Sequence, residues 1–170
     1  MKWLGAMMLI STTTWLGFDL SKKFKDRTTQ LRTLMQSLQI LEAEMSYSYA
    51  SLQQIFKNIS RKVDTPIQTF YERLADRLND VVSDFIIIWN EELTFFMKRS
   101  ALKPSDQEIL AQFGRNLGQH TLTQQQKHIQ LTIQYLQRQL EEAEEQKKRY
   151  ESMTKSIGVL IGLFIVILLF

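Results

Sequence analysis

Few side chains in this sequence have the types and the spacing that catalysis or metal binding requires. The two histidines, His120 and His128, lie eight residues apart, and no carboxylate cluster joins them at the spacing of a metal site. The sequence has no cysteine, which excludes disulfides, thiolate metal sites and cysteine nucleophiles. It has no G-x-x-x-x-G-K-[ST] loop, and the stretch Phe113–Gly118 follows no predicted strand, so no phosphate or dinucleotide motif is present. We therefore predict no catalytic, cofactor-binding or metal site.

The carboxylates are also poorly placed for acid–base chemistry, which needs two converging groups in a pocket. Glu42 and Glu44 are two residues apart and Glu91 and Glu92 are adjacent, so neither pair shares one helix face well. We interpret the four glutamates within 141–145 as a solvated face, with Glu144 to Lys148 and Glu145 to Arg149 as supporting i,i+4 pairs. The sequence thus predicts a protein that is not an enzyme. A membrane-bound hydrolase with a dispersed site is a rival that predicts a concave polar pocket.

The C-terminal end of the chain has the composition of a membrane anchor. Ser156–Phe170 is fifteen residues without a charge, and Lys147, Lys148, Arg149 and Lys155 precede it. As a helix, the uncharged stretch would be about 22 Å long, whereas the hydrocarbon core of a membrane is about 30 Å thick. Residues just before the stretch must therefore contribute to the membrane-spanning helix. We predict a transmembrane anchor over 153–170. The alternative is a buried C-terminal core helix.

The N-terminal end repeats this pattern more weakly. Trp3–Ser21 carries one charge, Asp19, and a group of basic residues follows it: Lys22, Lys23, Lys25 and Arg27. We predict an uncleaved transmembrane anchor over 1–21. The alternative is a cleaved signal peptide with Trp3–Ile10 as its apolar region, although no A-x-A-like site follows.

The charge distribution predicts the topology and limits the partners. Because the basic residues lie between the two predicted anchors, the positive-inside rule places the domain 22–152 in the cytoplasm. Net charge is +3 and the pI is about 9.1, and the charge beside the anchors suits the anionic headgroups of membrane lipid. Nucleic-acid binding would need a basic stripe interleaved with aromatic residues on one folded face, so we predict no nucleic-acid partner.

Between the anchors, apolar residues recur at steps of three and four, and capping signals divide the chain into six helices. The predicted helices are one that carries Leu31, Leu34, Leu38, Leu41 and Met45; one that begins at a Ser51–Gln54 capping box; one that begins at Thr65 with Pro66 and Gln68; one from Val82 to Ser100; one that begins at a Ser105–Glu108 capping box and is capped by Gly118; and one from Thr123 to Phe170. The fold class is therefore all-α, an antiparallel six-helix bundle flanked by transmembrane helices, with the aromatic stripes as its core. The last helix, unbroken over 48 residues or roughly 72 Å, would couple the bundle to the membrane.

Several of these segments together resemble one protein family. They are Lys2–Ala6 with Thr13–Phe18, Leu31–Leu38 with Leu41–Tyr47, Leu110–Gly118 with Gln126–Ile129, and Ser156–Leu163. With them the chain resembles, over nearly its whole length, the stage III sporulation protein AB family of endospore-forming bacteria. It departs from that family at Gln119–Leu122, where an aspartate is usual, and at Ser48–Ser51, where a glycine and a proline are usual. Both departures lie in predicted connections and so concern loop shape.

The resemblance implies a function that the residues themselves do not show. The family's soluble part is similar to the cytoplasmic six-helix domain of the platform proteins of type II secretion and type IV pilus machines. It implies a non-enzymatic platform without cofactors, in the outer forespore membrane on the mother-cell side. Its implied partners are membrane lipid, a secretion-type ATPase (stage III sporulation protein AA) and other channel subunits, and self-association stays open. The alternative is a membrane-anchored helical tethering or adaptor protein of another system.

Overall fold

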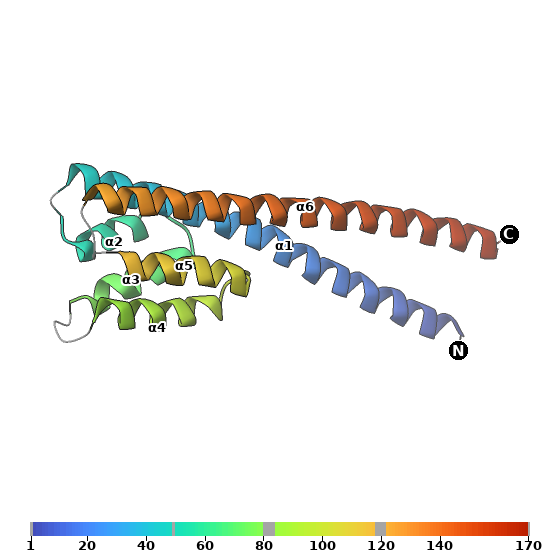
Figure 1. The fold of residues 1–170 in the computed structure, drawn as a ribbon. Coiled ribbons are helices and arrows are strands. Elements are labelled where there is room, and N and C mark those ends of the chain that lie inside the picture. Colours follow the sequence, from blue (N-terminus) through green and yellow to red (C-terminus); the bar gives the residue numbers. More distant parts are fainter. Residues whose placement is uncertain (1, 49, 80–83, 118–121, 170) are drawn as a thin grey trace.

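The computed structural model describes the backbone of residues 2–48, 50–79, 84–117 and 122–169, and the side chains of 22–48, 50–79, 84–117, 123–150 and Met153. Over these residues the chain forms six α-helices and no strand (Figure 1), which confirms the all-α prediction. The helices are α1 Lys2–Tyr47, α2 Leu52–Ser60, α3 Ile67–Arg77, α4 Phe85–Met97, α5 Pro104–Asn116 and α6 Leu122–Leu169.

The two predicted anchor segments are continuous with the first and last helices. Helix α1 has 46 residues and joins the N-terminal segment to the first bundle helix, because no glycine or proline lies between Gly17 and Tyr47 to interrupt it. Helix α6 has 48 residues, the length that the sequence predicted, and begins one residue earlier than Thr123. Within the part of the chain that the structure describes, no helix carries an apolar stretch long enough to cross a membrane. Apart from Met153, the side chains of 1–21 and 153–170 lie outside the described residues, so both anchors stay predictions.

Helices α1 and α6 run antiparallel and side by side along most of the bundle (Figure 1). Their side-chain contacts show the register, since a contact nearer the end of α1 lies nearer the start of α6. Gln126 donates to Ser46 at 2.7 Å and Gln130 donates to Glu42 at 2.9 Å. Apolar residues at helical spacing fill the seam between the two helices: Leu31, Leu34, Leu38 and Leu41 on α1, and Ile129, Leu136, Leu140 and Ala143 on α6. Each buried leucine or isoleucine contributes about 1.5–3 kcal/mol to this packing.

The four short helices pack on one side of this pair and build an aromatic core (Figure 1). Trp89 of α4 lies at its centre and is 1% exposed. Its ring centroid is 5.3 Å from that of Phe70 and 5.7 Å from that of Phe113, both in edge-on contacts that suit the ring quadrupoles. The indole Nε1–H donates to the Leu110 carbonyl of α5 at 3.0 Å, so its polar atom is satisfied inside the core. The predicted role of the aromatic stripes as bundle core is confirmed.

Gly114 allows this central packing. A Cβ atom at this position would lie 2.2 Å from the Cδ1 and Nε1 atoms of Trp89, a distance that no side-chain carbon tolerates. Helix α5 can therefore approach the face of the indole only where it has no side chain. The approach also brings the Leu110 carbonyl within reach of the indole N–H.

A buried polar contact joins α3 to α1. The Ser37 hydroxyl donates to the Leu34 carbonyl at 2.7 Å, so in the 2.9 Å contact between Ser37 and Tyr71 the phenol is the donor. Burial raises the pKa of the Tyr71 phenol to about 12. The phenol therefore stays neutral throughout the physiological range.

The capping predictions were partly correct. Ser51 caps α2 as predicted, with its Oγ accepting from the Gln54 N–H at 3.3 Å. The predicted start of α3 was wrong: the helix begins after Pro66, Thr65 makes no cap, and Gln68 donates to Glu72 one turn later instead of closing a box. Pro66 itself occupies the cap position.

The predicted boundaries of α4 and α5 also need correction. Helix α4 is shorter than Val82–Ser100, because the Asp84 carboxylate caps it by accepting from the Ile86 N–H at 3.2 Å. Helix α5 begins at Pro104, so the predicted Ser105–Glu108 box is two residues out of register. The cap residue of α5 is Lys103, whose N–H donates to Asp106 at 2.8 Å. The predicted cap at Gly118 lies outside the described residues.

We expect Gly114→Ala to destabilise the bundle by about 1–3 kcal/mol, because the new methyl group overlaps the indole of Trp89. This loss would outweigh the helix-propensity gain of up to about 1 kcal/mol that Gly→Ala gives elsewhere. Denaturant unfolding of the full chain in detergent, followed by far-UV circular dichroism, measures the change. Gln112→Ala, at an exposed position of the same helix, is the control and should stay within about 0.5 kcal/mol of wild type. An unchanged midpoint for Gly114→Ala would contradict the close approach.

Candidate functional site

The structure assembles no metal or catalytic cluster from the residues that it describes. His128 is half-buried on α6, and His120 lies outside the described residues. Among the described side chains, no group of three or more histidines, aspartates or glutamates is close enough to hold a metal ion. The candidate functional features of the bundle are therefore its buried ion pairs and the exposed surfaces of the helices that these pairs hold in place.

The predicted solvated face within 141–145 is only partly solvated. Glu144 pairs with Arg32 of α1, and Glu142 accepts from Lys103 at 3.4 Å. These contacts join α6 to α1 and to the start of α5, where the sequence suggested pairs within α6 alone. The acids on this part of α6 thus contribute to helix–helix packing at the rim of the bundle, although such exposed pairs are each worth at most about 1 kcal/mol.

Glu92 of α4 is a buried carboxylate, with its side chain 2% exposed. Arg73 and Arg77, one turn apart on α3, both donate to it, and each places one guanidinium nitrogen 3.1 Å from Oε1. Arg77 also lies 2.7 Å from Glu91, so adjacent acids that cannot share a face of their own helix are bridged by a neighbouring helix. Arg73 in addition stacks on the Phe95 ring at 4.1 Å.

The environment of Glu92 keeps it ionised. Burial by itself would raise the pKa of this carboxyl, but the hydrogen bonds from Arg73 and Arg77 outweigh burial and lower the pKa below its ordinary value. A carboxylate held by two guanidinium groups is a structural anion and a poor general base. This arrangement gives no support to the hydrolase hypothesis.

A second buried ion pair joins α1 to α5. Arg27 is 3% exposed and Asp106 is fully buried, and the guanidinium donates to both carboxylate oxygens, from Nε at 3.0 Å and from Nη2 at 2.9 Å. The same Nη2 donates to Gln139 of α6 at 3.0 Å, and Asp106 also accepts the Lys103 N–H that begins α5. The Asp106 carboxylate thus caps α5 and, through Arg27, holds α1 and α6 in register with it. We call Arg27, Asp106 and Gln139 the polar lock.

Sequence reasoning missed both ion pairs. It counted Arg27 among the exposed basic residues that follow the N-terminal segment. It gave Asp106 no role of its own and placed it between Ser105 and Glu108, the two ends of the predicted capping box. No periodicity marks either residue as buried, since a charged side chain in an amphipathic pattern is ordinarily assigned to solvent. The correction removes Arg27 from the exposed basic group, which leaves Lys22, Lys23 and Lys25 as what we call the N-terminal collar.

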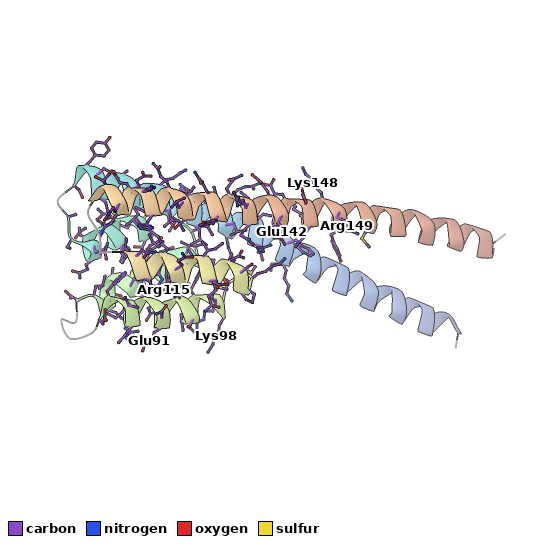
Figure 2. All side chains as sticks on the ribbon, viewed as in Figure 1. Glu91, Lys98, Arg115, Glu142, Lys148 and Arg149 are labelled. Atoms are coloured by element: carbon purple, nitrogen blue, oxygen red, sulfur yellow. The ribbon has the colours of Figure 1, made fainter. Side chains whose placement is uncertain are left out.

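The end of the bundle that faces the chain termini gathers positive charge. The rings of Phe24 and Tyr150 lie 5.5 Å apart, which brings the N-terminal collar level with the C-terminal collar of Lys147, Lys148 and Arg149. Figure 2 shows Lys148 and Arg149 where α6 extends past the short helices. The connection between α4 and α5, residues 98–103, lies at this same end (Figure 1) and is called here the α4–α5 turn.

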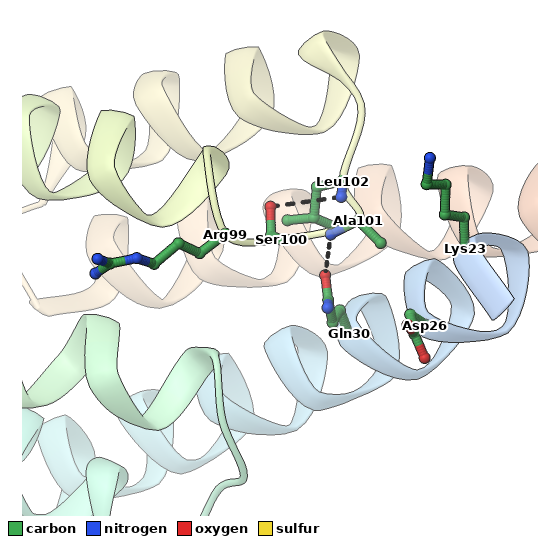
Figure 3. Close-up of a pocket in the computed structure, with 7 residues that line it drawn as sticks. All are labelled: Lys23, Asp26, Gln30, Arg99, Ser100, Ala101 and Leu102. Carbon is green, nitrogen blue, oxygen red and sulfur yellow. Dashed lines mark hydrogen bonds between the residues drawn. The ribbon is translucent and has the colours of Figure 1, made fainter. Parts of the chain in front are cut away.

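An open cavity of about 410 Å³ separates α1 from the α4–α5 turn (Figure 3). It is lined by Lys23, Asp26 and Gln30 of α1 and by Arg99, Ser100, Ala101 and Leu102 of the turn. Gln30 fastens the turn by accepting from the Ala101 N–H at 2.8 Å. The cavity is therefore the contact zone between the turn and the segment of α1 that follows the predicted anchor.

Exposed apolar side chains lie elsewhere on the bundle. Tyr47 at the end of α1 is 90% exposed and Ile87 of α4 is 55% exposed, and Leu131 and Tyr135 lie one turn apart on the outer face of α6. Scattered apolar residues are normal on a protein surface, so none of these positions by itself defines an interface. A protein partner would gain by burying these side chains.

We predict that Glu92→Gln destabilises the bundle by about 1–3 kcal/mol at neutral pH, because it removes the charge that Arg73 and Arg77 bind. Since the folded-state pKa is lowered, this contribution is complete above the unfolded pKa of about 4.3 and is lost as the pH falls through the folded value. The difference between wild type and variant should therefore shrink in acid, which unfolding curves over a pH series would measure. Glu108→Gln, an exposed acid of α5 outside this cluster, is the control. A difference that is independent of pH would contradict the ionised state.

For the polar lock, Asp106→Ala should cost about 3–5 kcal/mol, because it leaves Arg27 buried without its counter-ion. Adding Arg27→Met should recover at least half of that loss, since the buried charge is then gone. Chemical unfolding of the single and double variants measures the coupling. Glu108→Ala, an exposed acid of the same helix, is the control. A double variant no more stable than Asp106→Ala would show that the two residues are not coupled.

Comparison with known proteins agrees with this architecture. The chain matches the family model for stage III sporulation protein AB over residues 2–170. It is 35% identical over 169 residues to Stage III sporulation protein AB of Bacillus subtilis (strain 168), a match that covers 99% of both chains. A solved structure of Stage III sporulation protein AB (SpoIIIAB) is similar with a TM-score of 0.69 and 31% identity, over 73% of this chain and 98% of that one. The chain therefore belongs to the stage III sporulation protein AB family.

Proposed function

We propose that this sporulation protein is a non-enzymatic membrane platform of the channel apparatus between mother cell and forespore. In this role it links a cytoplasmic secretion-type ATPase, stage III sporulation protein AA, to the membrane rings of the channel. The observation that carries the proposal is the match to the family over residues 2–170, together with the helical body that the chain forms. The arrangement of the helices supports it further.

The long helices suit a connection between a membrane and a body held away from it. Helices α1 and α6 extend from the same end of the bundle and both chain termini lie beyond it (Figure 1). At about 1.5 Å per residue, the 48 residues of α6 measure roughly 72 Å and pass through bundle and collar without a break. The short helices, with their buried aromatic core and the ion pairs of Glu92, form a compact body on one side.

The charge pattern supports the proposed location. Both collars lie between the two predicted anchors, so the positive-inside rule favours a cytoplasmic bundle, here on the mother-cell side of the outer forespore membrane. In that orientation the end of the bundle away from the termini would face the cytoplasm, where an ATPase would dock. A tethering or adaptor role in another system uses the same anchors but needs no ATPase, and the experiment below separates the two.

Site-specific photo-crosslinking in membranes from sporulating cells tests the proposal. A photoreactive amino acid replaces Tyr47, Ile87 or Tyr135, which are exposed apolar positions away from the collars. We expect crosslinks to stage III sporulation protein AA from at least one of them, because exposed apolar side chains gain most from burial in an interface. The same probe at Lys22, in the N-terminal collar, is the control and should give no ATPase crosslink. Crosslinks only to the chain itself or to proteins across the membrane would favour the tethering role.

A further inference from the structure

Helix α4 lies at the outside of the bundle and has one face exposed to solvent. Its closest neighbours among the described helices are α3 and α5, and in Figure 1 it lies on the far side of the bundle from α1 and α6. Figure 2 shows Glu91 and Lys98 at the outer side of this helix. Because these two residues are two helical turns apart, they share one side of α4, which we call the outer face of α4.

The outer face of α4 is less polar than a solvent-facing helix surface ordinarily is. Nine of the 13 residues of α4 are apolar, so the helix is apolar nearly all round although only its inner side faces the core. Ile87 on the outer side is 55% exposed, and the ring of Phe95, about two turns further along, is partly exposed. A helix that is apolar all round is ordinarily buried on every side. The composition of α4 therefore indicates a further contact on its outer face.

Two arginines from different helices hold the Phe95 ring. The guanidinium carbon of Arg73 lies 4.1 Å from the ring centroid, and that of Arg99 lies 3.8 Å from it. Arg73 also binds Glu92, and Arg77 binds Glu91 at 2.7 Å. Both acids of α4 are thus already neutralised by arginines of α3.

The cations at the end of α4 have no such counter-ion. Lys98 and Arg99 are both exposed, and neither forms an ion pair within the part of the chain that the structure describes. Figure 3 shows Arg99 extending back along α4, away from Lys23. Stacking on a ring covers one face of a guanidinium and leaves its N–H edge available to a carboxylate. The ring also restrains the side chain of Arg99, which reduces the entropy that is lost when a partner binds it.

We propose that the outer face of α4, from Ile87 to Arg99, is a docking surface for an acidic amphipathic segment of a partner protein. Apolar side chains of that segment cover Ile87 and Phe95, and one of its carboxylates binds the N–H edge of Arg99. Apolar anchors combined with an arginine are typical of the residues that carry most of the affinity of an interface. The inference rests on the proposed function, in which the partner is the secretion-type ATPase.

A second copy of this chain fits the outer face of α4 less well. Two copies anchored in one membrane would lie parallel, and equal levels of their α4 helices would then meet. Lys98 and Arg99 would face the same cations of the other copy, which is a repulsive arrangement. An antiparallel pair would bring Glu91 opposite Arg99 but would place the predicted anchors at opposite ends of the dimer. The charges therefore favour a different protein that supplies acids.

Binding of purified stage III sporulation protein AA to the full chain in detergent tests this inference. We expect Ile87→Glu and Arg99→Glu each to raise the Kd about tenfold or more, because each removes an anchor of the interface. The wild-type affinity should also fall as the salt concentration rises, since the contact with Arg99 is electrostatic.

Matched variants on the opposite side of the bundle are the controls. Leu131→Glu and Arg138→Glu make the same two changes at exposed positions of α6 and should leave the Kd within about twofold of wild type. Wild-type helicity and an unchanged unfolding midpoint, followed by circular dichroism, are required of each variant. Ile87→Glu keeps the test decisive if Arg99→Glu is unstable, because Ile87 is largely exposed and makes no core contact.

The other outcomes separate this inference from the proposed function. Wild-type affinity in both Ile87→Glu and Arg99→Glu would overturn the docking surface and leave the platform intact, as would loss of binding in the α6 variants alone. If the wild-type chain does not bind the ATPase at all, the proposed function and this inference both fail. Sedimentation of the chain without the ATPase checks self-association: a dimer that Ile87→Glu converts to monomer would assign the face to a second copy and overturn the choice of partner.

Discussion

The buried carboxylate of Asp106 is the contact on which the arrangement of the helices depends most. It begins α5 by accepting the Lys103 N–H, and it binds Arg27 of α1, which in turn donates to Gln139 of α6. A buried ion pair costs several kcal/mol of desolvation per charge, so it adds little to net stability compared with an apolar replacement. Its effect is on register, because few other alignments of the three helices satisfy both charges. One nitrogen of Arg27, Nη1, is buried with no hydrogen-bond partner among the described residues, which shows that even this arrangement is not fully satisfied.

The apolar core is divided into two parts with different packing. Leucines and isoleucines at regular spacing fill the seam between α1 and α6, whereas rings from α2 to α5 surround Trp89. A regular aliphatic seam tolerates small shifts of α1 against α6 along their axes. The indole of Trp89 is less tolerant, because it needs the bare backbone of Gly114 beside it and the Leu110 carbonyl within hydrogen-bond distance. The short helices are therefore fixed relative to one another. Two buried contacts fix their position against α1: the hydrogen bond between Ser37 and Tyr71, and the polar lock.

These contacts place the α4–α5 turn and the two collars at the same end of the bundle. The lock and Gln30 hold the α4–α5 turn at the end where the long helices leave, and the ring pair of Phe24 and Tyr150 brings the two collars level. Positive charge from two distant parts of the sequence is thus gathered at one end of the body. The exposed apolar residues Tyr47, Ile87 and Tyr135 lie away from that end.

Local signals in the sequence determined the helical elements and most of the core. Steps of three and four identified the buried faces, and Ser51 marked the start of α2. No glycine or proline lies between Thr123 and Gly158, which was enough to predict a long last helix. They did not determine the starts of α3 and α5, because cap residues are common near helix ends and the backbone decides which one is used. The burial of Arg27, Glu92 and Asp106, and the position of the α4–α5 turn beside Lys23, were decided only by the tertiary structure. The physical reason is that a charge can be buried only beside its counter-ion, and here each counter-ion lies on another helix, 15 to 79 residues away along the chain.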